Sequence, residues 1–187
     1  MKEASVLTGN LVRLRPIEPT DLERYYTWIN DPEVARFLAT RWLYSMAEEE
    51  EFVRTAAKQT RPPEVKLAID TLEDGRHIGS VNLHAIQMED RRATLGVMIG
   101  DKSYWDHGYG SDAIRTIVRY GFEELNLQRV DLTCDERNER GIACYRKCGF
   151  VEEGRMRKHR FAGGRYWDTV MMAVLVDDYF AGREVEQ

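Results

Sequence analysis

The sequence is short of cysteine and of long apolar runs. It has three cysteines, Cys134, Cys144 and Cys148, and no two of them form a Cys-x-x-Cys pair, so we expect no disulfide framework. No segment reaches the roughly 20 apolar residues that a membrane-spanning helix needs. The first ten residues, MKEASVLTGN, lack the apolar run of a signal peptide. These absences predict a cytoplasmic protein without a membrane partner.

Positive charge is also scarce. Lysine and arginine number 27 against 32 aspartates and glutamates, which gives a formal net charge of -5. A general nucleic-acid binder would show a basic excess, so we expect no nucleic-acid partner, whereas the acidic balance is compatible with a cationic substrate. The chain lacks repeats and any Pro/Gly/Ser-rich linker. Its 187 residues, 43% of them hydrophobic, fit a single soluble domain over residues 1–187.

A metal site is not expected. Cys144 and Cys148 stand four residues apart, but a zinc site needs three or four convergent ligands and no second pair of ligands is apparent. Neither cysteine has the neighbouring base in the sequence that would mark a nucleophilic thiol. We therefore interpret both cysteines as small residues of a helix.

The N-terminal third of the sequence predicts one strand followed by two helices. Residues 10–15 alternate leucine and valine with polar residues, as in a strand. The capping box Thr20–Glu23 predicts a helix that Asp31-Pro32 ends. A second capping box, Ser45–Glu48, predicts a helix that runs to about Lys58.

The rest of the chain alternates strands with two further helices. Apolar residues at helical spacing from Ile114 to Leu125 predict one helix, and Asn138 and Gly149 are typical of the two ends of another. We expect strands at residues 65–70, 77–85, 92–99, 129–134, 151–161 and 165–176, with turns at Asp74-Gly75 and Gly163-Gly164. This order predicts a mixed sheet with helices packed on its faces, an α+β or α/β layered fold.

The loop before the long helix carries a Gly-x-Gly motif at Gly108 and Gly110. A strand, a short loop with glycines and a helix start together point free backbone N–H groups at an anion, and glycine lets the backbone approach a pyrophosphate closely. The full dinucleotide fingerprint and the P-loop lysine are both missing. On the glycines alone, a tight turn at a helix start explains the motif equally well.

A second motif follows at residues 138–150, where Asn138 precedes Tyr145 by seven residues and Lys147-Cys148-Gly149-Phe150 comes next. Together, residues 105–110 and 138–150 resemble the acetyl-CoA loop and the second signature of the GCN5-related N-acetyltransferase (GNAT) superfamily. The stretch from Glu153-Gly154-Arg155 through Gly164 to Asp168 is similar to one branch of that superfamily. That branch holds ribosomal-protein N-terminal and spermidine N-acetyltransferases.

The resemblance implies a fold, a co-substrate and a mechanism. The fold would be a mixed, mostly antiparallel sheet of about seven strands, with splayed middle strands and helices on both faces. The co-substrate would be acetyl-CoA, and Tyr145 would be the general acid that protonates the departing thiolate. Two such subunits commonly pair, so a homodimer is implied as well. The implied acetyl-CoA contacts are Val97, Met98, Ile99, Trp105, Asp106, His107, Gly108, Tyr109, Gly110, Ser111 and Asn138.

The loop departs from the family pattern at three positions. The family commonly has Arg or Gln where Trp105 stands, and Gly followed by Lys or Arg where Asp106 and His107 stand. Two like unit charges about 4 Å apart repel by about 4 kcal/mol at an effective dielectric constant of about 20. We therefore expect Asp106 to face solvent or to pair with a basic side chain, and the phosphates to contact mainly backbone amides.

The sequence leaves several candidates for the acceptor and for the general base. The branch resemblance implies a primary amine on a protein N-terminus, a polyamine or an aminoglycoside-like molecule. Asn82, His84 and Glu89 are candidates for the base, and bulk water is another. A non-catalytic acyl-CoA-binding sensor or assembly domain is the alternative to an enzyme. The aromatic residues of the early helices either form the acceptor side or pack in the core: Tyr25, Tyr26, Trp28, Phe37, Trp42 and Tyr44.

Overall fold

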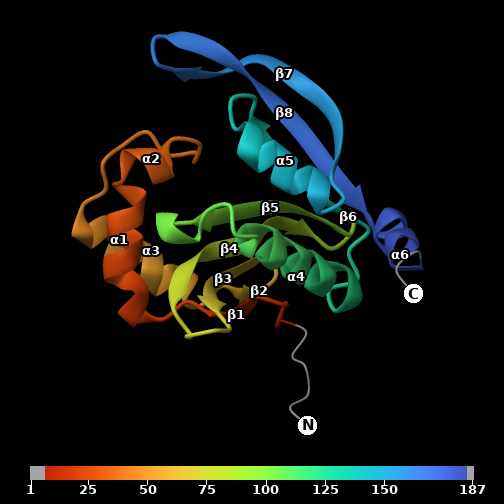
Figure 1. The fold of residues 1–187 in the computed structure, drawn as a ribbon, viewed down its shortest axis with the longest axis horizontal. Coiled ribbons are helices and arrows are strands. Elements are labelled where there is room, and N and C mark those ends of the chain that lie inside the picture. Colours follow the sequence, from red (N-terminus) through yellow and green to blue (C-terminus); the bar gives the residue numbers. More distant parts are fainter. Residues whose placement is uncertain (1–6, 185–187) are drawn as a thin grey trace.

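One open sheet of eight strands organises the molecule (Figure 1). The structure, a computed structural model, describes residues 7–184. Residues 1–6, which belong to the N-terminal segment considered for a signal peptide, lie outside the described residues. The strands run β1-β3-β4-β5-β6-β8-β7 across the sheet, with β2 paired only to β3. The bounds are Val12–Pro16 (β1), Thr60–Arg61 (β2), Glu64–Thr71 (β3), His77–Gln87 (β4), Arg92–Ile99 (β5), Arg129–Asp135 (β6), Val151–Ala162 (β7) and Arg165–Leu175 (β8).

Helices cover both faces of this sheet. Along β3, Leu67 and Ile69 belong to the larger core cluster, which contains the apolar face of α4, whereas Ala68 belongs to a smaller cluster with α1 and α3. Successive residues of a strand point to opposite faces, so the two clusters lie on opposite faces of the sheet. The helices are Leu22–Ile29 (α1), Pro32–Ala35 (α2), Met46–Ala56 (α3), Tyr109–Glu123 (α4), Glu139–Lys147 (α5) and Val176–Glu184 (α6), with short 3-10 helices at Pro19–Asp21 and Lys102–Tyr104. The expected layered fold is confirmed.

Local sequence signals explain most of the helix ends. The predicted capping box at Ser45 is present, since Glu48 N–H donates to Ser45 Oγ and Ser45 N–H donates to Glu48. The capping box predicted at Thr20 is wrong. Pro19 starts a 3-10 turn one residue earlier, and the Asp21 carboxylate accepts from Glu18 N–H.

The two middle strands pair over only a short stretch. The parallel β5–β6 register joins Arg92 to Arg129, Ala93 to Val130 and Thr94 to Asp131, and ends there. Further along, β5 stays paired with β4 up to Ile99, and β6 stays paired with β8 up to Asp135. The C-terminal ends of β5 and β6 therefore separate and leave a gap in the sheet.

The β7–β8 hairpin is the longest pair of strands and reaches over α5 toward α2 (Figure 1). At its tip, Arg160 donates to the carbonyl groups of Arg36, Phe37 and Leu38, which follow α2. The hairpin thus contacts the segment after α2 on the far side of the gap.

No helix within residues 7–184 is long and apolar enough to cross a membrane.

Candidate active site

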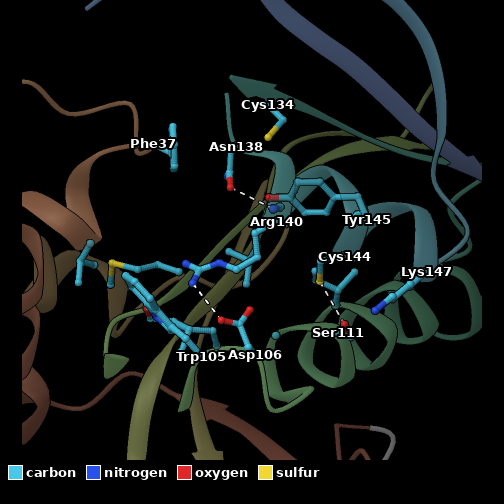
Figure 2. Close-up of a pocket in the computed structure, with 18 of the residues that line it drawn as sticks. Phe37, Trp105, Asp106, Ser111, Cys134, Asn138, Arg140, Cys144, Tyr145 and Lys147 are labelled. Atoms are coloured by element: carbon cyan, nitrogen blue, oxygen red, sulfur yellow. Dashed lines mark hydrogen bonds and ion pairs between the residues drawn. The ribbon is translucent and has the colours of Figure 1, made fainter. Parts of the chain in front are cut away.

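A cleft of about 470 Å³ opens where β5 and β6 separate (Figure 2). The segment around α2 lines one end, through Glu33, Val34, Phe37 and Leu38, and the start of α4 lines the other. Ten of the residues expected to contact acetyl-CoA or to act in catalysis line this cleft: Val97, Met98, Ile99, Trp105, Asp106, Gly108, Gly110, Ser111, Asn138 and Tyr145. His107 and Tyr109 do not line it: the His107 side chain is exposed, and Tyr109 packs edge to face on Tyr104.

The start of α4 presents unpaired backbone donors to the cleft. Gly108 precedes the helix with a φ of +88°, in the left-handed region that glycine adopts without strain. The first N–H groups of a helix, here those of Tyr109, Gly110 and Ser111, have no partner within the helix. No other acceptor within residues 7–184 receives a hydrogen bond from them. With the helix dipole, these N–H groups make a site for an anion such as a pyrophosphate.

The exposed edge of β5 offers further donors inside the gap. Gly100 N–H donates to Ile78 O of β4, and peptide groups alternate in direction along a strand. The N–H groups of Val97 and Ile99 therefore face the gap left by β6. An extended molecule lying in the gap would meet free N–H groups, as at any unpaired strand edge.

The unusual loop side chains form a stacked set with Arg140 of α5. Trp105 Nε1–H donates to Ile99 O at 2.7 Å, and the Arg140 guanidinium lies 4.0 Å from the centre of the Trp105 ring. Arg140 also forms an ion pair with Asp106 at 3.5 Å, and the Asp106 side chain is 69% exposed. The expectation that Asp106 faces solvent or pairs with a base is confirmed on both counts. Arg140 was not predicted as a site residue from the sequence. The one signal for it was its position within the second motif, two residues after Asn138.

Tyr145 projects from α5 with its hydroxyl end directed into the cleft (Figure 2). Its ring packs edge to face on Phe150. The hydroxyl makes no hydrogen bond within residues 7–184. Burial raises the pKa of Tyr145 above its usual value, and the neighbouring thiols raise it further. The phenol is therefore protonated near neutral pH and free to donate to a group in the cleft.

Cys144 of α5 and Cys148, directly after this helix, both contact Ser111 at the start of α4. Cys144 lines the cleft, and its Sγ lies 3.1 Å from Ser111 Oγ. A hydrogen bond with Cys148 lowers the pKa of Cys144 below its usual value, against the opposing effect of burial. Cys134 differs, because burial raises its pKa to about 11. The sequence interpretation of Cys144 as an ordinary helix residue missed this contact with Ser111, because the contact joins two elements.

The proposed bases lie elsewhere. Asn82, His84 and Glu89 do not line the cleft. His84 Nδ1 lies 2.8 Å from Asn82 Oδ1, and Glu89 is exposed in the turn after β4. The carboxylates that do line the cleft, Glu33 and Asp106, are paired with Lys102 and Arg140. No side chain among those lining the cleft is thus an unpaired carboxylate or a histidine.

The early aromatic residues divide between core and surface. Tyr25 and Trp28 are buried, as expected for core residues, and Phe37 lines the cleft. Trp42 is 75% exposed, in the loop after α2.

No group of three or more His, Cys, Asp or Glu side chains within residues 7–184 is arranged to hold a metal ion.

The chain belongs to the GNAT family of N-acetyltransferases, because the family model described as acetyltransferase (GNAT) domain matches residues 12–151. It is similar to the spermidine N(1)-acetyltransferase of Escherichia coli strain K12, with 31% identity over 93% of this chain and 91% of that one. A putative ribosomal N-acetyltransferase of Bacillus subtilis, YdaF, is 34% identical over 56% of each chain. Among solved structures, Vibrio cholerae spermidine N-acetyltransferase in complex with CoA and spermine matches with a TM-score of 0.82 and 26% identity, over 90% of this chain and 98% of that one.

Proposed function

We propose that this N-acetyltransferase moves an acetyl group from acetyl-CoA to a primary amine by direct attack, with Tyr145 as the general acid. The acceptor classes implied by the family are a protein N-terminus, a polyamine or an aminoglycoside-like molecule. The observation that carries the proposal is the unpartnered Tyr145 hydroxyl, which points into a cleft between two separated strands. The similar Vibrio cholerae structure contains CoA, which supports the choice of acyl donor.

The cleft fits acetyl-CoA through groups that are free in the structure. The N–H groups of Tyr109, Gly110 and Ser111 would hold the pyrophosphate, and Gly108 lets the backbone turn there. The free N–H groups of Val97 and Ile99 would pair with the pantetheine arm and polarise the thioester oxygen. Arg140 adds a cation at the cleft wall. Trp105, Asp106, Met98 and Asn138 line the same wall, whereas His107 and the Tyr109 side chain lie outside the cleft.

Tyr145 moves one proton in this scheme. Acetyl-CoA supplies an acetyl group that is already activated as a thioester. Tyr145 donates its phenolic proton to the sulfur as the carbon–sulfur bond breaks and the new carbon–nitrogen bond forms. The phenol has a pKa of about 10 or above, whereas the conjugate acid of the thiolate has a pKa of about 8.5. The proton transfer is therefore energetically uphill, and direct contact between the hydroxyl and the sulfur makes it feasible. We propose that water accepts the amine proton, since the cleft lining offers no unpaired carboxylate or histidine.

The exchange Tyr145→Phe tests this assignment. We expect kcat to fall by about 100-fold or more, as for the loss of a general acid, while the Kd of acetyl-CoA stays nearly unchanged. Steady-state kinetics and calorimetric titration of acetyl-CoA measure the two quantities. Tyr120→Phe, which removes the hydroxyl of a partly buried tyrosine on α4 outside the cleft lining, is the matched control. Equal losses in kcat and affinity would show that Tyr145 serves binding or folding instead.

Further features of the protein are part of the same proposal. We propose that residues 1–187 form one domain, that two copies pair as a homodimer, and that the enzyme acts in the cytoplasm without metal or nucleic acid. A single sheet that contains every strand of residues 7–184 supports the one-domain assignment. The non-catalytic acyl-CoA-binding alternative has less support, because the similar proteins are named as N-acetyltransferases.

A further inference from the structure

A second hollow, of about 360 Å³, lies beside the cleft. It is bounded by the segment around α2 and the loop after it, and by Arg160, Phe161 and Ala162 at the tip of the β7–β8 hairpin. The two hollows share α2 as a wall: Glu33 and Val34 line the cleft, whereas Pro32 and Ala35 line the second hollow. We call this second hollow the arginine groove.

The arginine groove is cationic. Arg36, Arg41 and Arg160 line it, and none of its lining residues carries a carboxylate. Arg36 and Arg41 are exposed, and neither forms an ion pair within residues 7–184. Arg160 is mostly buried, and its guanidinium shares the charge of Asp135 with Arg137. The groove therefore has positive charge that the described part of the chain does not neutralise.

The hairpin extends the same charge away from the groove. Arg157, Lys158 and Arg165 lie on its outer half, where none of them pairs with a carboxylate among the described residues. Arg165 stacks 3.7 Å from the centre of the Trp167 ring, which keeps its charged group on the surface. A local excess of arginine stands out in a chain whose formal net charge is -5.

The carboxylates near the arginine groove already form ion pairs within the chain. Lys102 pairs with Asp31 at 2.8 Å and with Glu33 at 3.0 Å, so both carboxylates at α2 are in ion pairs and the three groups together keep one negative charge. Asp135 is fully buried against Arg137 and Arg160. A polyamine carries a positive charge on each amine and would meet arginines without free carboxylates on this side. An acceptor with negative charge near its amine meets the complementary surface.

The geometry points to an acceptor that is a peptide or protein N-terminus followed by acidic residues, with the acidic residues bound in the arginine groove. This inference rests on the proposed acetyl transfer and narrows its acceptor. A helix with its side chains is about 10 Å across, which an extended chain spans in about three residues. An amine in the cleft would thus place the third and following residues of the acceptor at the groove. Arginine binds carboxylates there in a bidentate manner, and the exposed Trp42 and Phe161 provide apolar contacts.

Matched peptides test the inference through kcat/KM. One peptide reads Ser-Ala-Glu-Glu-Glu-Ala, its partner reads Ser-Ala-Lys-Lys-Lys-Ala, and spermidine is the third acceptor. We expect the acidic peptide to exceed the other two by about tenfold or more, with an advantage that shrinks as salt rises. The double variant Arg36→Glu, Arg41→Glu should abolish this preference by raising KM. Arg61→Glu, at an exposed arginine of β2 outside both hollows, is the charge-matched control.

A binding experiment tests this inference separately from the proposed function. The acidic peptide with a blocked N-terminus cannot accept an acetyl group, and we expect it to change the fluorescence of Trp42 and to bind the double variant about tenfold more weakly. Binding of this peptide without acetyl transfer to any amine would overturn the proposed function and support the groove. Acetyl transfer that favours the lysine peptide or spermidine, or a double variant with unchanged preference, would overturn the inference alone. Tighter binding of an RNA oligonucleotide than of the acidic peptide would also overturn it.

Discussion

At the scale of single residues, the loop before α4 shows how an unfavourable side chain is compensated. Asp106 would repel a phosphate, but Arg140 pairs with it while stacking on Trp105. Trp105 in turn is fixed by its hydrogen bond to Ile99 O. The three side chains therefore bring a cation to the wall of the cleft from α5, next to residues 105–107 of the loop, which include no lysine or arginine.

Cys144 should be the most reactive thiol of the protein. Its lowered pKa favours the thiolate form, whereas burial raises the pKa of Cys134 to about 11 and keeps that thiol protonated. We expect iodoacetamide at pH 7.5 to modify Cys144 before Cys134, and acetyl-CoA to slow the reaction because Cys144 lines the cleft. Mass spectrometry of digested protein measures both rates.

The variant Cys148→Ala tests the cause of this reactivity. The hydrogen bond from Cys148 is the main cause of the lowered pKa of Cys144, so removal of the donor at 148 should slow alkylation at neutral pH. Faster modification of Cys134 than of Cys144 would contradict the account of the thiols. Modification of Cys144 at the same rate with and without acetyl-CoA would contradict the placement of the acyl donor.

Sequence alone identified the residues whose roles are local. Gly108 and Asn138 act on the turn or helix next to them, so spacing along the chain predicts them. Arg140 and Cys144 gain their roles from partners more than 30 residues away, which spacing cannot reveal. The family resemblance supplied Tyr145, whose exposure to the cleft depends on how α5 packs.

At the scale of elements, Asp112 fixes the start of α4 against the N-terminal strand. Its buried carboxylate accepts from the N–H groups of Asn10, Leu11 and Val12, at 2.7–3.0 Å. Asp112 also lies in the first turn of α4, where a negative charge stabilises the helix dipole. The N-terminal end of α4, with its free N–H groups, is thereby held in place beside the cleft.

The exchange Asp112→Ala should lower the free energy of unfolding by about 3 kcal/mol, because it leaves three backbone donors without their acceptor. The affinity for acetyl-CoA should fall as well, since the start of α4 loses its anchor. Urea denaturation and titration of acetyl-CoA measure the two effects. Glu73→Ala, at an exposed turn position, controls for the loss of one charge. A change below about 1 kcal/mol would show that α4 is held by its apolar face alone.

The order of the longer elements was predictable, but the short ones were not. Each long strand and helix has its own apolar period, so the sequence predicted β3 to β8, α3, α4 and α5 near their observed positions. The two-residue β2 and the four-residue α2 are too short to show a period. The expected last strand ended at residue 176, whereas β8 stops at Leu175 and α6 begins at Val176.

At the scale of the whole molecule, the site depends on one parallel pairing in an otherwise antiparallel sheet. Because β5 and β6 pair at three positions only, the gap between them becomes a cleft bounded by α2, α4 and α5. Alternation along each strand predicts a sheet but not where two strands separate, because that depends on partners distant in the sequence. The splayed strands were predicted from the family resemblance and not from the alternation of apolar and polar residues.

Net charge also fails to describe this molecule locally. The chain is acidic overall, which is compatible with a cationic substrate, yet the hollow beside the cleft is lined by arginines. The arginines come from residues 36–41 and from the hairpin tip near residue 160, which only the fold brings together. The charge that an acceptor meets therefore follows from the tertiary structure.

Amine-dependent release of CoA tests the central claim most directly. The purified protein is mixed with acetyl-CoA and a panel of primary amines that includes the acidic peptide, the lysine peptide and spermidine. Free thiol and the mass gain of one acetyl group on the amine are then measured together. The account predicts that both increase in equal amounts and only when an acceptor amine is present. Tight binding of acetyl-CoA without thiol release on any amine would contradict it.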